Sequence, residues 1–173
     1  LEDVGPAVRM RRWKHSLTHF SVHSDGRRAP ATRVMPALIR SRRRKLCKAA
    51  RRLNARSTQT QYHAVRLRGK KLRYAVESVI ALYGRRAEKF LRVLRKVQRA
   101  LGEQHYAYIV RQAVLALVRQ PSRGFSSEAV LSMSRMAVQQ TAAAVEAREA
   151  FHETYRKLRG KRWKRLRRAM IAA

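Results

Sequence analysis

The sequence predicts an all-α protein, an antiparallel bundle of long amphipathic helices. The chain of 173 residues is rich in Ala, Leu, Arg and Lys and has only seven glycines and four prolines, a composition that favours helices over strands. Apolar residues recur at helical spacing between short segments of turn residues, and short connections favour antiparallel neighbours. With 45% hydrophobic residues, the chain is long enough for one domain with a single core.

The first 30 residues are expected to be separate from a bundle that occupies residues 31–173. A short helix is expected from Val8 to Phe20, and "SDGRRAP" after it has the composition of a linker. Three histidines of this region are spaced four residues apart: His15, His19 and His23. This spacing could align metal ligands on one helix face. No carboxylate or thiolate joins them, and the surrounding Arg and Lys repel cations, so no metal site is expected.

The first two helices of the bundle have recognisable ends. The first is expected from about Arg33 to Arg56, with Pro36 in its first turn, where a missing N–H costs little. Thr58 and Gln61 have the spacing of a capping box, which predicts the start of the second helix. Gly84 is expected to end it.

Two further helices complete the predicted bundle. The third is expected from Arg86 to Val118, with an interruption at Gly102. "QPSRGFSS" is the next loop, and either Ser126 or Ser127 is a suitable N-cap for a long last helix. That helix is expected to reach the "KLRG" segment that begins at Lys157.

The net charge restricts the choice of partner. The chain has 42 Lys and Arg against 10 Asp and Glu, a formal net charge of +32. So many like charges repel one another in a compact state unless an anion neutralises them, which makes nucleic acid, an anionic membrane or inorganic polyphosphate the candidate partners. The longest apolar runs, such as 113–118, are far shorter than the roughly 20 residues of a membrane span. Cys47 has no disulfide partner, which fits a reducing, cytoplasmic location and a buried structural role.

The stretch "YHAVRLRGKKLRYAVE", residues 62–77, places a basic stripe beside an apolar one. At roughly 100° per residue, the stripe falls within an arc of about 80° and consists of His63, Arg66, Lys70, Arg73 and Glu77. Val65, Leu72 and Val76 form the neighbouring apolar arc, so the stripe should line a groove between helices. The same spacing recurs at Lys89, Arg92, Lys96 and Arg99, and at Ser41, Arg44, Lys48 and Arg51. Three successive helices therefore carry a basic ladder, which predicts a shared anion-binding surface.

The same residues resemble a known family. "HAVRLRGKKLRYAVE", then "ALYG" and "FLRVLRKVQRALGEQH", resemble the conserved histidine α-helical domain, CHAD, whose signature is His-x-x-Arg-x-x-x-Lys-x-Leu-Arg-Tyr-x-x-Glu followed downstream by Leu-Gln-x-x-Leu-Gly. The resemblance extends from about Arg33 to the C-terminus. It implies two four-helix bundles around a basic cavity, of which this chain supplies the second, and it implies binding of inorganic polyphosphate.

Two departures from the family pattern affect these expectations. Nothing before residue 30 supplies the histidine motif of a first bundle, so the other half is expected from another part of the protein, a partner chain or, most simply, a second copy in a homodimer. After Leu101-Gly102 the family commonly has an Asn-Asp pair that caps the next helix, whereas this chain has His105 and Tyr106.

Binding of polyphosphate without catalysis is the predicted function, with association with polyphosphate granules as an expected location. The expected ligand contacts are Arg44, Lys48, Arg51, His63, Arg66, Lys70, Lys71, Arg73, Lys89, Arg92, Lys96 and Arg99. Tyr74 and Glu77 are expected to orient them, with Glu77 paired to Arg73 one turn away. For His63 two roles stay open, a switchable cation or a neutral hydrogen-bond donor. No cofactor is expected.

Three alternative partners or functions fit the sequence less well. Nucleic acid is the closest rival, but with 7% aromatic residues and no recognised motif, bases would have little to stack on. A phosphoryl-transfer enzyme would need carboxylates to hold metal ions, and no acidic cluster exists. The basic segment "KLRGKRWKRLRRAM" around Trp163 could lie on anionic lipid or be bound as a calmodulin-type target helix. We expect it instead to extend the anion-binding surface at the end of the last helix.

Overall fold

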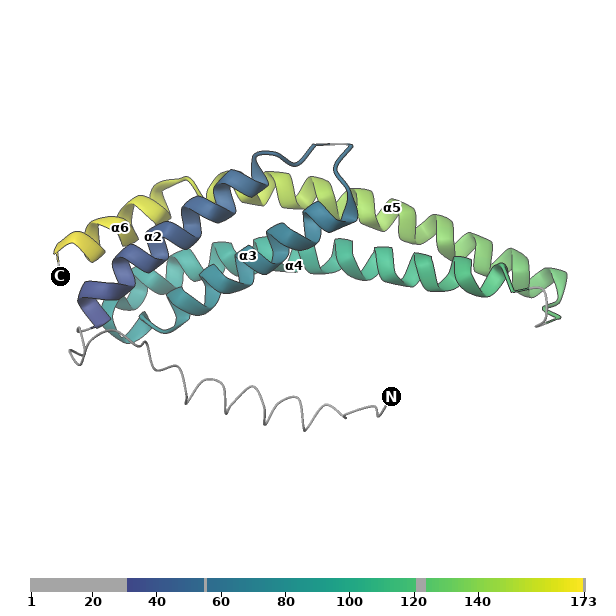
Figure 1. The fold of residues 1–173 in the computed structure, drawn as a ribbon, viewed down its shortest axis with the longest axis horizontal. Coiled ribbons are helices and arrows are strands. Elements are labelled where there is room, and N and C mark those ends of the chain that lie inside the picture. Colours follow the sequence, from purple (N-terminus) through teal and green to yellow (C-terminus); the bar gives the residue numbers. More distant parts are fainter. Residues whose placement is uncertain (1–30, 55, 121–123, 173) are drawn as a thin grey trace. The chain divides into compact units, whose positions relative to one another are not determined.

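The computed structural model describes residues 31–54, 56–120 and 124–172, and in these ranges it contains five helices and no strand (Figure 1). The helices are α2 (Ala31–Ala50), α3 (Gln59–Glu77), α4 (Ile80–Val118), α5 (Ser127–Lys157) and α6 (Lys161–Ala172). The prediction of an all-α protein is confirmed. The helix expected from Val8 to Phe20 and the three histidines of that region lie outside the described residues.

Four helical positions surround one core. Helix α3 packs between α2 and α4, while α4 also packs against α5 and α6, and α6 returns to α2. The end of α5 and helix α6 together take the place of the fourth helix of the bundle. Two hydrogen bonds join this part of the chain to α2: the Tyr155 hydroxyl donates to the Cys47 carbonyl (3.0 Å), and Arg43 donates to the Leu158 carbonyl (3.3 Å). Figure 1 shows α4 and α5 continuing side by side beyond the ends of α2 and α3. The bundle therefore carries a projecting two-helix hairpin.

The core draws large apolar side chains from all five helices. The fully buried ones include Ile39, Leu46, Tyr62, Leu72, Phe90, Leu94, Phe151 and Leu166. Burial of each such side chain stabilises the fold by roughly 1.5–3 kcal/mol. Cys47 is buried among them, as expected of a structural thiol.

The connection between α2 and α3 differs from the prediction at one end and agrees at the other. Helix α2 ends at Ala50 rather than near Arg56. Asn54 explains the early end, because its side chain accepts from the Arg56 N–H (2.9 Å) while its own N–H donates to Ser57 (2.8 Å), and such local bonds compete with the helix. The capping box that starts α3 is confirmed: Thr58 and the side chain of Gln61 each accept from the other's backbone N–H.

Gly84, which was expected to end the second helix, and Gly102, which was expected to interrupt the third, both behave differently from expectation. Helix α3 ends at Glu77, and Gly84 lies inside α4 with φ +46° and ψ −134°, a left-handed conformation that other residues rarely adopt. Gly84 therefore marks a kink after the first turn of α4. The interruption expected at Gly102 is wrong, because α4 runs through it. Glycine costs a helix only about 1 kcal/mol relative to alanine, which the buried contacts of α4 outweigh.

The C-terminal part forms two helices rather than one. Of the two serines predicted as N-cap, Ser126 caps α5: its hydroxyl accepts from the Ala129 N–H (3.2 Å). After α5 ends at Lys157, a short turn leads to α6, which buries Trp163, Leu166 and Met170. The bundle thus covers the apolar face that a lipid surface or a partner helix would need. Within the described ranges, the search for a helix long and apolar enough to cross a bilayer finds none.

Candidate anion-binding site

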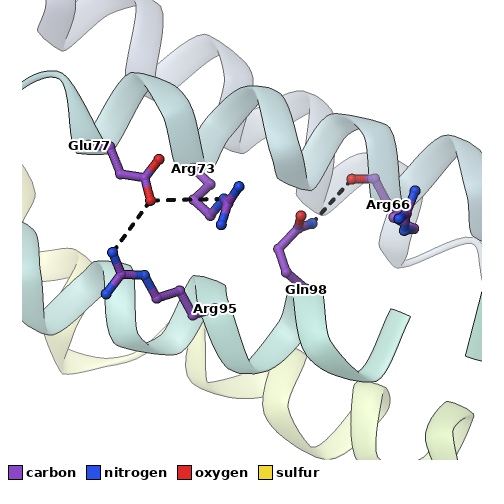
Figure 2. Close-up of polar contacts among 5 residues, drawn as sticks. All are labelled: Arg66, Arg73, Glu77, Arg95 and Gln98. Carbon is purple, nitrogen blue, oxygen red and sulfur yellow. Dashed lines mark hydrogen bonds and ion pairs between the residues drawn. The ribbon is translucent and has the colours of Figure 1, made fainter. Parts of the chain in front are cut away.

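The basic ladder of α3 lies against one face of α4. The Gln98 amide donates to the Arg66 carbonyl (3.1 Å), and Arg95 donates to the Glu77 carboxylate (3.5 Å) (Figure 2). Further along the same contact, the rings of His63 and His105 lie 5.2 Å apart, measured between centroids. We call this contact the α3–α4 seam; its members are His63, Arg66, Lys70, Arg73 and Glu77 of α3 and Arg95, Gln98 and His105 of α4.

Gly69 allows the two helices of the seam to approach closely. It is buried, and a Cβ atom at this position would overlap the amide of Gln98. The missing side chain therefore leaves room for Gln98 to reach the Arg66 backbone. Gln98 is also the glutamine of the "VQRALG" segment, so the sequence contained a signal for it that the prediction of ligand residues did not use.

The seam holds basic groups that are only partly solvated. The four basic residues of the α3 ladder are half-buried, as is Glu77. The ion pair expected between Arg73 and Glu77 is present but long, at 4.0 Å, and Arg95 adds a second partner to the same oxygen. The Arg73 guanidinium lies 5.0 Å from the centre of the Tyr74 ring, and its Nε is buried without a hydrogen bond among the described residues. One carboxylate of the seam thus faces several cations.

His105 was expected to weaken the family pattern, but the structure places it in the seam. The side-chain oxygen of Gln59 accepts from the amide of Gln104 (2.6 Å). The NH₂ group of Gln59 therefore donates to His105 Nδ1 (3.0 Å). The neutral ring then carries its proton on Nε2. Burial lowers the pKa of His105 below the usual 6.5, and the charges of Arg66 and His63 lower it further. In the free protein, the environment therefore favours the uncharged form of this ring.

This arrangement predicts that polyphosphate binding strengthens as the pH falls below about 6.5. The unfolded chain protonates His105 more readily than the folded one, so stability without ligand should decrease over the same pH range. A phosphate chain beside the ring reverses the preference, since it stabilises the imidazolium, and the gain should approach tenfold. The measurement is affinity for long-chain polyphosphate at pH 7.5 and 5.5 and constant salt. His105→Asn should flatten the profile; an unchanged profile in this variant would contradict the assignment.

The α4 ladder does not face α3. Lys96 and Arg99 directly follow Arg95 and Gln98, which both contact α3, and each step along a helix rotates the side chain by about 100°. The charge of Lys96 instead acts on Glu153 of α5. The pKa of Glu153 is lowered mainly by its hydrogen bond to Lys157 and by the charge of Lys157, and to a smaller extent by the charges of Arg156 and Lys96. The remaining members of this ladder are Lys89, which is half-buried, and Arg92, which is exposed.

The α2 ladder is also turned away from the seam. Arg42 is the residue that contacts α3, donating to the Lys71 carbonyl (2.8 Å), and Arg43 stacks on Trp163 of α6 at 4.4 Å. The predicted ligands of this ladder are all exposed: Arg44 and Lys48 on α2, and Arg51 directly after its end. The structure therefore brings the α3 ladder into contact with a second helix, while the other two ladders lie on surrounding surfaces.

No metal centre is found in the part of the chain that the structure describes. Within those residues, no group of three or more His, Cys, Asp or Glu side chains is placed to hold an ion. The donors of the seam are guanidinium, ammonium, amide and imidazole groups, which suit an anion.

Fold and seam together define a strongly basic helical-bundle protein whose charged groups converge between two helices. The family model of the CHAD domain matches residues 6–116, more than half of the chain, and the protein belongs to the CHAD family. The match begins earlier than the resemblance described from the sequence, and it ends within α4. It includes α2, α3 and all the seam residues, but not α5 or α6. No curated protein and no solved structure matches the chain.

Proposed function

We propose that this protein binds inorganic polyphosphate at the α3–α4 seam without turning it over. The observation that carries the proposal is the half-buried ladder of α3 opposite Arg95 and His105, with Glu77 as the single acidic member of the seam. Hydrogen bonds from cationic groups to phosphate oxygens are strong, and partial burial reduces their competition with water. Polyphosphate binding is also what the CHAD domain is generally known for.

A long polyphosphate chain can use the surrounding ladders as well. The exposed basic residues of α2 and α4 lie outside the seam and would contact segments of the polymer that extend past it. Their contribution per residue should be smaller, because exposed charge pairs are screened by salt and water. Association with polyphosphate granules would follow directly from binding of the polymer.

Binding without catalysis fits the residues of the seam. Phosphoryl transfer needs metal ions that carboxylates hold next to the reacting phosphate. Glu77, the acid of the seam, is already engaged by Arg73 and Arg95. The site therefore neutralises and positions phosphate, and the single carboxylate of the seam is not free to hold a metal ion for phosphoryl transfer.

The test is a competition titration at physiological salt, with DNA and long-chain polyphosphate matched in phosphate concentration. Both polyanions release counterions on binding, so salt dependence does not distinguish them. Polyphosphate has no sugars or bases between its charges, so it can place more charge per unit length in a narrow seam. It should displace single-stranded and duplex DNA. If DNA displaces polyphosphate at equal phosphate, the surface is a general polyanion site.

We further propose that a homodimer pairs along the projecting hairpin. Leu131, Val138 and Val145 are exposed on α5 at intervals of seven residues, the spacing of a coiled-coil seam. Val138 is the most exposed of the three, at 70%, and several exposed apolar residues along one helix indicate an interaction surface where a single one would not. Helix α5 also contains four glutamates and four Arg or Lys, so repulsion between copies is lowest along it.

We predict that two copies pair along this face when the remaining charge is neutralised. Light scattering should show a dimer with polyphosphate or at high salt, and mainly a monomer in dilute buffer. Val138→Lys should keep the protein monomeric in all these conditions, whereas Val34→Lys, at an exposed position on α2, should not. A wild-type protein that stays monomeric with ligand and at high salt rules out the pairing.

A further inference from the structure

A second basic pocket lies between α4 and α6, apart from the α3–α4 seam. Its volume is about 480 Å³. It is lined by Leu82, Tyr83 and Arg86 of α4 and by Arg165, Arg168, Ala169 and Ala172 of α6. None of these residues belongs to the seam. Arg165 and Arg168 lie in the basic C-terminal segment that was expected to extend the anion-binding surface, whereas Tyr83 and Arg86 were not predicted to bind a ligand.

The pocket collects three guanidinium groups without a counterion in the described part of the chain. Arg165 and Arg168 are one helical turn apart on α6, and Arg86 faces them from α4. No carboxylate lines the pocket, and none of the ion pairs among the described residues involves these three arginines. Three such forks around one cavity offer up to fifteen N–H donors to an anion, at five donors per arginine.

Tyr83 adds a polar group that lacks a partner. Its side chain is only 5% exposed, and its hydroxyl is buried without a hydrogen bond to any described residue. A buried tyrosine hydroxyl normally has a partner, because leaving it unpaired costs free energy. A ligand oxygen in the pocket would accept this hydrogen bond.

The local backbone explains why this tyrosine reaches the pocket. Gly84 has φ +46°, which breaks the regular rotation of α4 between Tyr83 and Arg86. Tyr83 directly before this break is buried, while Leu82 beside it is exposed and forms an apolar wall of the pocket. The pocket therefore combines a cationic side with an apolar side, which suits a compact ligand rather than a long polymer.

We propose that this pocket binds a compact phosphate-bearing anion, held by Arg86, Arg165 and Arg168 and by the Tyr83 hydroxyl. The phosphate group can come from a short inorganic oligophosphate or from a phosphate ester such as a nucleotide. Bidentate contacts between guanidinium groups and phosphate oxygens provide the affinity. The site is independent of polyphosphate binding at the seam.

Calorimetric titration of the full chain with tripolyphosphate and with ATP tests the proposal. Arg165→Ala with Arg168→Ala should weaken binding about 100-fold, at roughly tenfold for each lost charge-assisted contact. The matched control is Lys164→Ala with Arg167→Ala, which removes the same charge from α6 outside the pocket and should change affinity less than about threefold. Tyr83→Phe keeps the ring packed and should weaken binding about three- to tenfold.

Each outcome of the titration either supports a phosphate site in the pocket or rules it out. Binding of ATP alone identifies a phosphate ester as the ligand, binding of tripolyphosphate alone identifies an inorganic one, and binding of both shows that the phosphate group is sufficient. If the pocket variant loses no more affinity than its control, or if neither anion binds, the pocket is not a phosphate site. Arg66→Ala, Lys70→Ala and Arg73→Ala together should leave these short ligands bound while reducing long-chain polyphosphate binding, so failure of one site is distinguishable from failure of the other.

Discussion

Replacement of Arg66, Lys70 and Arg73 together by alanine is expected to weaken polyphosphate binding by several kcal/mol. Each charge-assisted contact to phosphate contributes roughly 1.5–3 kcal/mol, and the three residues lie in sequence along the half-buried ladder of α3. DNA binding should decrease much less, because a diffuse polyanion contact can use the remaining positive charge. The measurement is the competition titration at physiological salt, with both anions matched in phosphate.

A second triple variant tests whether the position of the basic residues, and not only their charge, determines polyphosphate affinity. Arg44, Lys48 and Arg51 form the exposed ladder of α2, and their replacement by alanine removes the same three charges. Because this ladder does not face the seam, polyphosphate affinity should decrease by well under half as much in free energy. Equal losses in the two variants, or a proportional loss of DNA binding in the first, would mean that charge alone determines affinity. Circular dichroism checks that both variants remain helical.

The seam could be predicted from the sequence on its α3 side but not on its α4 side. Periodicity placed His63, Arg66, Lys70 and Arg73 beside the apolar face of one helix, and this property depends on local geometry alone. Helix α4 carries polar residues on both flanks of its apolar face, so its own periodicity cannot decide which flank meets α3. The contact between Gly69 and Gln98 sets that choice, and it exists only in the folded bundle.

The ends of the helices could be predicted where they depend on local side chains, but not where they depend on tertiary packing. Caps at Thr58 and Ser126 were predictable because they depend on side chains within three residues of the cap. Gly102 was predicted to interrupt a helix and does not, since the packing of α4 outweighs its low propensity. The pocket at Tyr83 could not be foreseen, because it requires α6 to fold back onto the start of α4.

The position of α6 predicts a large loss of stability on replacement of Trp163 by alanine, about 3–5 kcal/mol. Trp163 is 6% exposed, its ring centre lies 5.4 Å from that of Phe90, and Arg43 stacks on it at 4.4 Å. Removal of the ring leaves a cavity and takes the stacking partner from a half-buried guanidinium. Urea unfolding should show a lower midpoint with an unchanged slope.

Two control variants on α6 show whether the loss of stability is specific to the buried Trp163 ring. Trp163→Phe keeps an aromatic ring against Phe90 and Arg43 and should cost about half as much or less. Ile171→Ala, at a position that is 67% exposed on the same helix, should change stability by no more than about 0.5 kcal/mol. A helix that served as a lipid anchor would behave differently: Trp163→Ala would then leave the unfolding midpoint unchanged and abolish binding to anionic vesicles. Because the Trp163 ring fills a space between α2 and α4, we expect the urea midpoint to decrease. That result would establish α6 as a structural helix of the bundle.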